Sequence, residues 1–112
     1  MGIYLNISDA MSRLNNNKNI FVKFLKKFDG AAMLEDLKNK IEAGDAEAAR
    51  AQAHTIKGLA ANLSLQDLHA KAAALELAIK TAGTTDGINL SEISESTAAT
   101  DEAVKAWIEA NE

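Results

Sequence analysis

Residues 44–64, GDAEAARAQAHTIKGLAANLS, decide the fold, because they combine a helix start, a long run without a helix breaker and two unlike faces. Gly44 can end the preceding helix and Asp45 can cap a new one, which we expect to run to about residue 63. With His54 at zero and a step of about 100° per residue, a mostly apolar set falls on the opposite side. That set is Ala49, Gln52, Ile56, Leu59, Ala60 and Leu63. It predicts the core face, so His54 is predicted to point toward water.

The neighbours of His54 on this exposed face are small or charged. Those within about 60° of it are Glu47, Arg50, Ala51, Lys57, Gly58 and Ala61. A glycine inside a helix costs roughly 1 kcal/mol relative to alanine, so the missing side chain of Gly58 needs a reason. We interpret Gly58 as leaving the flank of the imidazole open to a large partner. A helix–helix contact at Gly58 is disfavoured, because Gly58 faces away from the core stripe.

The chain before residue 44 is predicted to hold three helices. A short helix at residues 8–14 is followed by a loop of three asparagines at residues 15–17. Apolar residues at helical spacing predict the second helix and place its phenylalanines in the core, not in a cofactor site. They are Ile20, Phe21, Phe24, Leu25 and Phe28. Gly30 is expected to end that helix, and a third apolar stripe comprises Met33, Leu34, Leu37 and Ile41.

The chain after residue 63 is predicted to hold two more helices. Ser64 and Asp67 form a weak capping box for a helix that Gly83 ends. Its core face is Leu65, Leu68, Ala72, Leu75 and Ile79. Residues 84–87 are predicted to form a turn. An apolar pattern from Ile93 to Ile108 predicts the last helix, with Trp107 packed on the bundle. The middle of this helix, residues 94–100, is polar, and its structure is left undecided. The sequence therefore predicts an all-α fold, an antiparallel four-helix bundle with one or two short additional helices at the N-terminus.

Composition narrows the functional classes. The chain has 112 residues, no cysteine, no proline and a formal net charge of -4. We expect one domain, residues 1–112, with no disulfide and no thiolate metal site, in the cytoplasm. The acidic balance argues against nucleic acid as a partner. No uncharged stretch approaches the ~18 residues of a membrane span, and residues 1–8 lack the layout of a signal peptide.

The frame AHTIKG, which contains His54, Lys57 and Gly58, resembles the signature of histidine phosphotransfer (HPt) domains of multistep two-component phosphorelays. The resemblance extends to ISDAMSRLNNNKNIFVKFLKKF upstream and KAAALELA downstream. It implies that His54 is the phosphoryl acceptor, that Lys57 is the charge partner of the phosphoryl group and that Gly58 gives access. It also implies that Glu76 orients the imidazole. The chain departs from many members at Ala61 and Ser64, where they carry glycine.

The resemblance implies a phosphorelay intermediate, not an enzyme. Such a domain would accept a phosphoryl group from a receiver-domain aspartate on His54 and pass it to another receiver domain. The expected partners are receiver domains of response regulators or hybrid histidine kinases, with Mg²⁺ in the partner and no cofactor in this chain. We expect a monomer without ATP binding, since no glycine-rich nucleotide loop is present. Whether the chain is freestanding or part of a hybrid kinase stays open.

Other interpretations of the same residues remain to be weighed. The alternative function is a non-catalytic helical protein-interaction module. A metal site at Glu47 and His54 fits poorly, because Arg50 and Lys57 would repel a cation between them. His69 lacks the lysine–glycine context and is interpreted as a solvated side chain. Glu76 could instead pair with Lys80 at i+4, and the role of Arg50 is left open.

Overall fold

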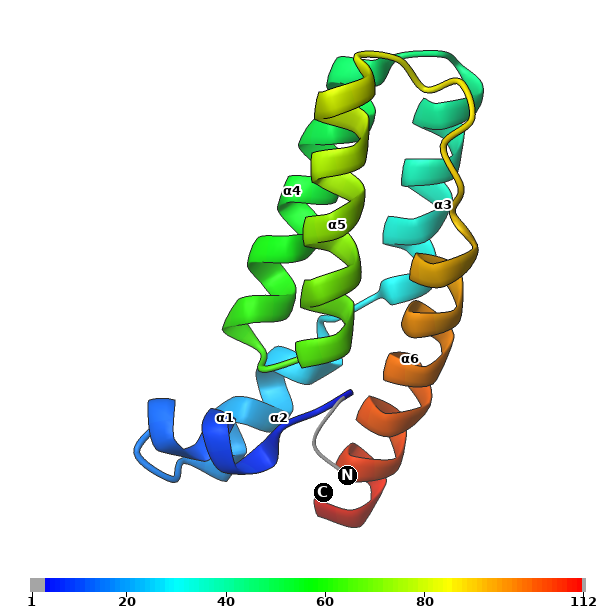
Figure 1. Cartoon of the computed structure of the whole chain (residues 1–112). Coiled ribbons are helices and arrows are strands. Elements are labelled where there is room, and N and C mark those ends of the chain that lie inside the picture. The colour runs from blue at the N-terminus through cyan, green and yellow to red at the C-terminus, as the bar shows by residue number, and fades with distance from the viewer. Residues whose placement is uncertain (1–3, 112) are drawn as a thin grey trace.

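The computed structural model describes residues 4–111, and within that range every regular element is an α-helix (Figure 1). The helices are α1 (Ile7–Arg13), α2 (Lys18–Lys26), α3 (Gly30–Glu42), α4 (Ala46–Asn62), α5 (Gln66–Ala82) and α6 (Ser91–Asn111). Side chains cap the first four: Asn6, Asn17, Asp29 and Asp45 each accept a backbone N–H of the first turn. These caps satisfy donors that have no partner inside the helix.

The four longer helices form a helical bundle, and α1 and α2 lie at one of its ends (Figure 1). The contact between α4 and α5 is the most extensive in the molecule. Their buried faces carry fully buried alanines at positions 49, 53, 60 and 72, and small side chains let two helices approach closely. This close pair determines which side chains of α4 and α5 meet at the surface.

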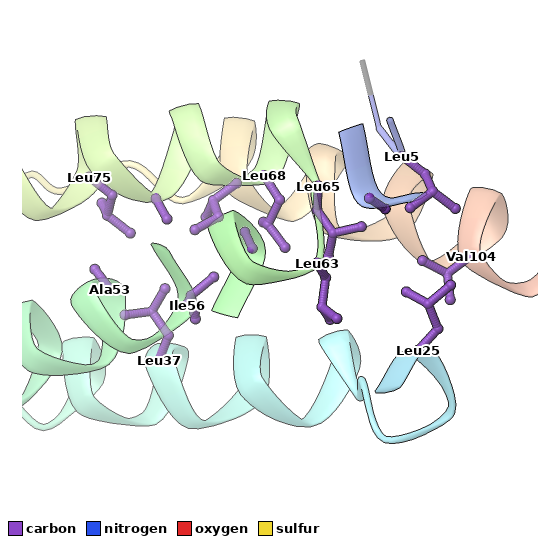
Figure 2. Packing of buried hydrophobic residues seen from close by; sticks show 14 of the residues in the cluster. Leu5, Leu25, Leu37, Ala53, Ile56, Leu63, Leu65, Leu68, Leu75 and Val104 are labelled. Carbon is purple, nitrogen blue, oxygen red and sulfur yellow. The ribbon is translucent and has the colours of Figure 1, made fainter. Parts of the chain in front are cut away.

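The core runs along the bundle between these helices (Figure 2). Leu37, Leu65, Leu68 and Ile79 are almost completely buried, as the apolar stripes of α3 and α5 predict. The undecided middle of α6 is helical, and it buries Ser96, Thr97 and Thr100. The described residues contain no helix with the length and apolarity that a bilayer crossing requires.

The predicted core stripe of α2 is partly wrong. Phe21 and Leu25 are buried, but Ile20 is 38% exposed and Phe24 45% exposed. The third buried position is instead Val22. Among the described helices, α2 packs on α1 and α6 alone. It therefore buries a narrow arc, and that arc is turned away from Ile20 and Phe24.

Two predicted helix boundaries are also wrong. Gly30 does not end a helix but begins α3, and α2 already ends at Lys26. Ser64 does not cap α5, because Leu65 takes that position without a side-chain cap. Ser64 has a left-handed backbone with φ of 59°, and its hydroxyl donates to Asp9 Oδ2 at 2.6 Å. The short tie to α1 fixes this turn. Gly44 and Gly83 confirm the other two predicted stops, with φ of 75° and 69°.

Candidate functional site

His54 lies in the middle of α4 on the side away from the core, and its side chain is 63% exposed. The imidazole nevertheless has one fixed contact, because its Nδ1 lies 2.9 Å from Glu76 Oε2 on α5. An ionised carboxylate only accepts hydrogen bonds, so Nδ1 must donate in this contact. The neutral ring then carries its lone pair on Nε2, the nitrogen with no partner among the described residues. The site therefore presents a nucleophilic nitrogen to solvent.

Glu76 is the hub of the site, and its side chain is only 15% exposed. While Oε2 accepts from His54, the other oxygen lies 2.8 Å from Lys57 Nζ. The Lys57 hydrogen bond, followed by that of His54, lowers the pKa of the Glu76 carboxyl, and partial burial opposes the shift. Glu76 therefore stays ionised at neutral pH and cannot rotate without losing one of two contacts. The alternative pairing with Lys80 is not formed.

Arg50 joins this network one turn before His54 on α4. Its Nη1 lies 3.7 Å from Glu76 Oε2, the oxygen that already binds His54, and its Nη2 lies 2.5 Å from Glu47 Oε1. The Glu47 hydrogen bond is the main cause that raises the pKa of the Arg50 guanidinium. Sequence reasoning placed Glu47 and Arg50 on the His54 face but missed their link. The i, i+3 spacing was the available signal.

Gly58 leaves the surface beside His54 open. It lies inside α4 and is exposed, and a Cβ atom built on it would meet nothing within 4 Å. Ala51 and Ala61, on the same face, add only methyl groups. A large partner could therefore approach the imidazole from this side without a clash.

The structure brings His54, Lys57 and Glu76 into one cluster and places Gly58 at its edge, whereas His69 lies apart from it. His69 is half-buried near the start of α5, in a small cavity of about 190 Å³ that Arg13 and Ser64 also line. Among the described residues no three His, Cys, Asp or Glu side chains form a group that could hold a metal ion. At the His54 cluster, the cations Lys57 and Arg50 both lie close to the Glu76 carboxylate.

In a comparison with known families, the family model described as Hpt domain matches residues 27–110. The chain belongs to the Hpt domain family. No curated protein and no solved structure gives a significant match. The Hpt match begins directly after α2 and takes in α3, α4, α5 and nearly all of α6. It therefore includes every residue of the His54 cluster.

Hpt domains are phosphotransfer intermediates of phosphorelays and are not kinases. Their chemistry needs a reactive imidazole and a surface for a partner, and it needs no nucleotide pocket in the domain itself. The exposed Nε2 of His54 and the open flank at Gly58 are compatible with both requirements.

Proposed function

We propose that this Hpt domain accepts a phosphoryl group on Nε2 of His54 from the phosphoaspartate of one receiver domain and passes it to the aspartate of another. The observation that carries the proposal is the 2.9 Å contact between His54 Nδ1 and Glu76 Oε2. This contact assigns the proton to Nδ1 and the lone pair to the exposed Nε2. A histidine without such a partner would have no fixed tautomer.

The transfer can be written in terms of this chain's own groups. The Nε2 lone pair attacks phosphorus, the Nε2–P bond forms, and the bond from phosphorus to the aspartate oxygen breaks, so the receiver carboxylate leaves. Positive charge that develops on the ring is stabilised through Nδ1–H by Glu76. In the second transfer the receiver aspartate attacks phosphorus and the imidazole leaves. Glu76 supports both directions because it stays in place.

Lys57 and Gly58 have complementary proposed roles. The Lys57 ammonium has three donors, so it can bind Glu76 and also contact a phosphoryl group on the ring. Gly58 lets the receiver approach in line. The Mg²⁺ that phosphoryl transfer requires is proposed to come with the receiver domain, and this chain is proposed to need no cofactor.

The fold supports this function through the close packing of α4 on α5. We propose that α3, α4, α5 and α6 form the antiparallel four-helix bundle of the domain, that α1 and α2 are additions to it, and that residues 1–112 act as one monomeric unit. The ends of α4 are fixed by Asp45 at its start and by the Arg13 guanidinium, which donates to the Ala61 carbonyl at 2.7 Å, near its end. A site on a rigid helix keeps its geometry through the transfer.

The test compares two histidine variants. The protein is mixed with a phosphorylated receiver domain and Mg²⁺, and acid-labile, alkali-stable label is measured. We expect label on the wild type and on His69→Gln and none on His54→Gln. The proposal fails if His54→Gln is labelled, if ATP alone labels the protein, or if the receiver binds and no label is transferred. The last outcome would support the interaction module instead.

A further inference from the structure

Glu76 Oε2 lies within reach of two donors, although the structure gives it to one. His54 Nδ1 is at 2.9 Å, whereas Arg50 Nη1 is at 3.7 Å, just outside hydrogen-bond distance. A guanidinium binds a carboxylate more strongly than a neutral imidazole does, because its bond is charge-assisted. A shift of less than about 1 Å would bring Arg50 onto this oxygen. A second contact of Arg50 is therefore needed to keep its guanidinium at this distance from Glu76 Oε2.

Glu47 supplies that restraint. Its Oε1 lies 2.5 Å from Arg50 Nη2, the shortest contact that Arg50 makes. The spacing along α4 places the groups involved on one helix face, at positions i, i+3 and i+7. These residues are Glu47, Arg50 and His54. Lys57 holds Oε1 of Glu76 from the opposite side, so the carboxylate cannot turn to offer Arg50 its other oxygen.

We propose that Glu47 and Arg50 are positioning residues for His54: Glu47 holds the Arg50 guanidinium, which reserves Glu76 Oε2 for the Nδ1 proton and keeps Nε2 free. Neither residue touches the reacting atoms. Their effect passes through Glu76, and its consequence for phosphoryl transfer rests on the function proposed above. Loss of Glu47 releases Arg50 to Oε2, where its charge-assisted bond competes with the hydrogen bond from Nδ1. The Nδ1 proton is then held less strongly, and the ring shifts toward a mixture of tautomers.

The primary experiment reads the tautomer of His54 directly, in the unphosphorylated protein. Long-range ¹H–¹⁵N correlation spectra at alkaline pH, where imidazoles are neutral, distinguish Nδ1–H from Nε2–H for each ring. The chain has two histidines, so His69 is an internal reference that the variants should not change. The variants are Glu47→Ala, Arg50→Met and the double substitution. Glu35→Ala removes an exposed carboxylate of α3 that has no ion pair among the described residues, and it serves as the matched control.

We expect the wild type, Arg50→Met and Glu35→Ala to show the Nδ1–H form of His54. Glu47→Ala should lose it, and the double variant should regain it, because no guanidinium remains to compete. A loss of structure alone would not be reversed by a second substitution. The proposal is overturned if Glu47→Ala keeps the Nδ1–H form or if the double variant fails to restore it.

A second measurement separates this proposal from the function itself. Labelling by phosphoramidate, which needs no docking surface, should slow by roughly two- to tenfold in Glu47→Ala and return in the double variant. If wild-type protein takes no label from phosphoramidate or from a receiver, the proposed function fails while the tautomer result still decides the role of Glu47. If wild type is labelled and Glu47→Ala is labelled at the same rate, the positioning role fails and the function stands.

Discussion

Gly30 and Gly58 are both helical glycines with ordinary backbone angles, yet the structure uses them for opposite purposes. A Cβ atom on Gly30 would lie 2.8 Å from Asp101 Oδ1, 2.9 Å from Thr97 Cγ2 and 3.1 Å from the Phe28 ring, whereas one on Gly58 would meet nothing within 4 Å. At Gly30 the missing side chain lets α3 and α6 pack. At Gly58 it leaves the His54 face open. One residue type therefore allows close packing at one place and access at another.

The largest effect is expected from Gly30→Ala. The Asp101 carboxylate can turn away, but Thr97 is β-branched and buried and cannot move without disturbing the core. Overpacking of this kind lowers the free energy of unfolding by about 1–3 kcal/mol. Urea unfolding of the wild type and the variant measures the loss. An unfolding midpoint equal to that of the wild type would mean that α3 and α6 separate more easily than the structure indicates.

Gly58 should give the opposite sign. Gly58→Gln is expected to raise the free energy of unfolding by roughly 0.5–1 kcal/mol, because the helix gains propensity and the added Cβ atom meets nothing within 4 Å. The same side chain would stand beside His54, so transfer from a receiver should fall far more than labelling by phosphoramidate.

Gly58→Ala is the matched control, since it gains stability without the reach of a glutamine side chain. Transfer from the receiver should therefore remain faster in Gly58→Ala than in Gly58→Gln. Equal transfer in wild type and Gly58→Gln would end the access role, while a loss of stability would show that this face of α4 is not open.

The surroundings of Gly58 could be predicted from the sequence, whereas those of Gly30 could not. The helical period placed Gly58 opposite the core stripe, and the open space around it in the structure agrees. Nothing in the pattern near Gly30 reveals Thr97 or Asp101, because they belong to α6, far along the chain. Local signals also located the cap at Asp45 and the left-handed stops at Gly44 and Gly83.

Side-chain contacts between different helices could not be predicted from local sequence patterns. The pairing of His54 with Glu76 was expected only from a family resemblance, and the contact exists because small buried side chains bring α4 and α5 close together. Arg50 could have turned to either of two carboxylates. The exposure of Phe24 followed from which helices α2 packs against, which its own stripe does not encode.

Lys57→Ala tests whether the His54 face contributes to stability at all. Lys57 binds Glu76 at the rim of the bundle, and ion pairs near the surface contribute little to folding. The melting temperature should therefore change by less than about 3 °C. Phosphoryl transfer should slow, because the cation that we propose to contact the phosphoryl group is lost. Normal rates combined with a large fall in melting temperature would show that Lys57 is structural.

The smallest effects concern the pH dependence of folding stability. They should have opposite signs at Asp101, beside Gly30, and at Glu76, in the His54 cluster. Partial burial, and then repulsion from Asp29, raises the pKa of Asp101, although its hydrogen bond from Gly30 opposes the shift. The pKa of Glu76 is lowered, first of all by Lys57. A raised carboxyl pKa in the folded state removes stability as pH rises above the ordinary value of about 3.9, whereas a lowered one adds stability that is lost as pH falls.

Asp101→Asn should therefore gain stability over the wild type at pH 7, with a difference that shrinks toward about pH 3.5, the ordinary range for a carboxyl group. Glu76→Gln should lose stability relative to the wild type at pH 7, and its difference should also shrink in acid, because protonation of Glu76 gives up the same contacts. Both changes are small since the two carboxylates keep contact with solvent. Urea unfolding at the two pH values measures them. If the two substitutions changed the stability at pH 7 in the same direction, Asp101 and Glu76 would be in similar surroundings, contrary to the structure.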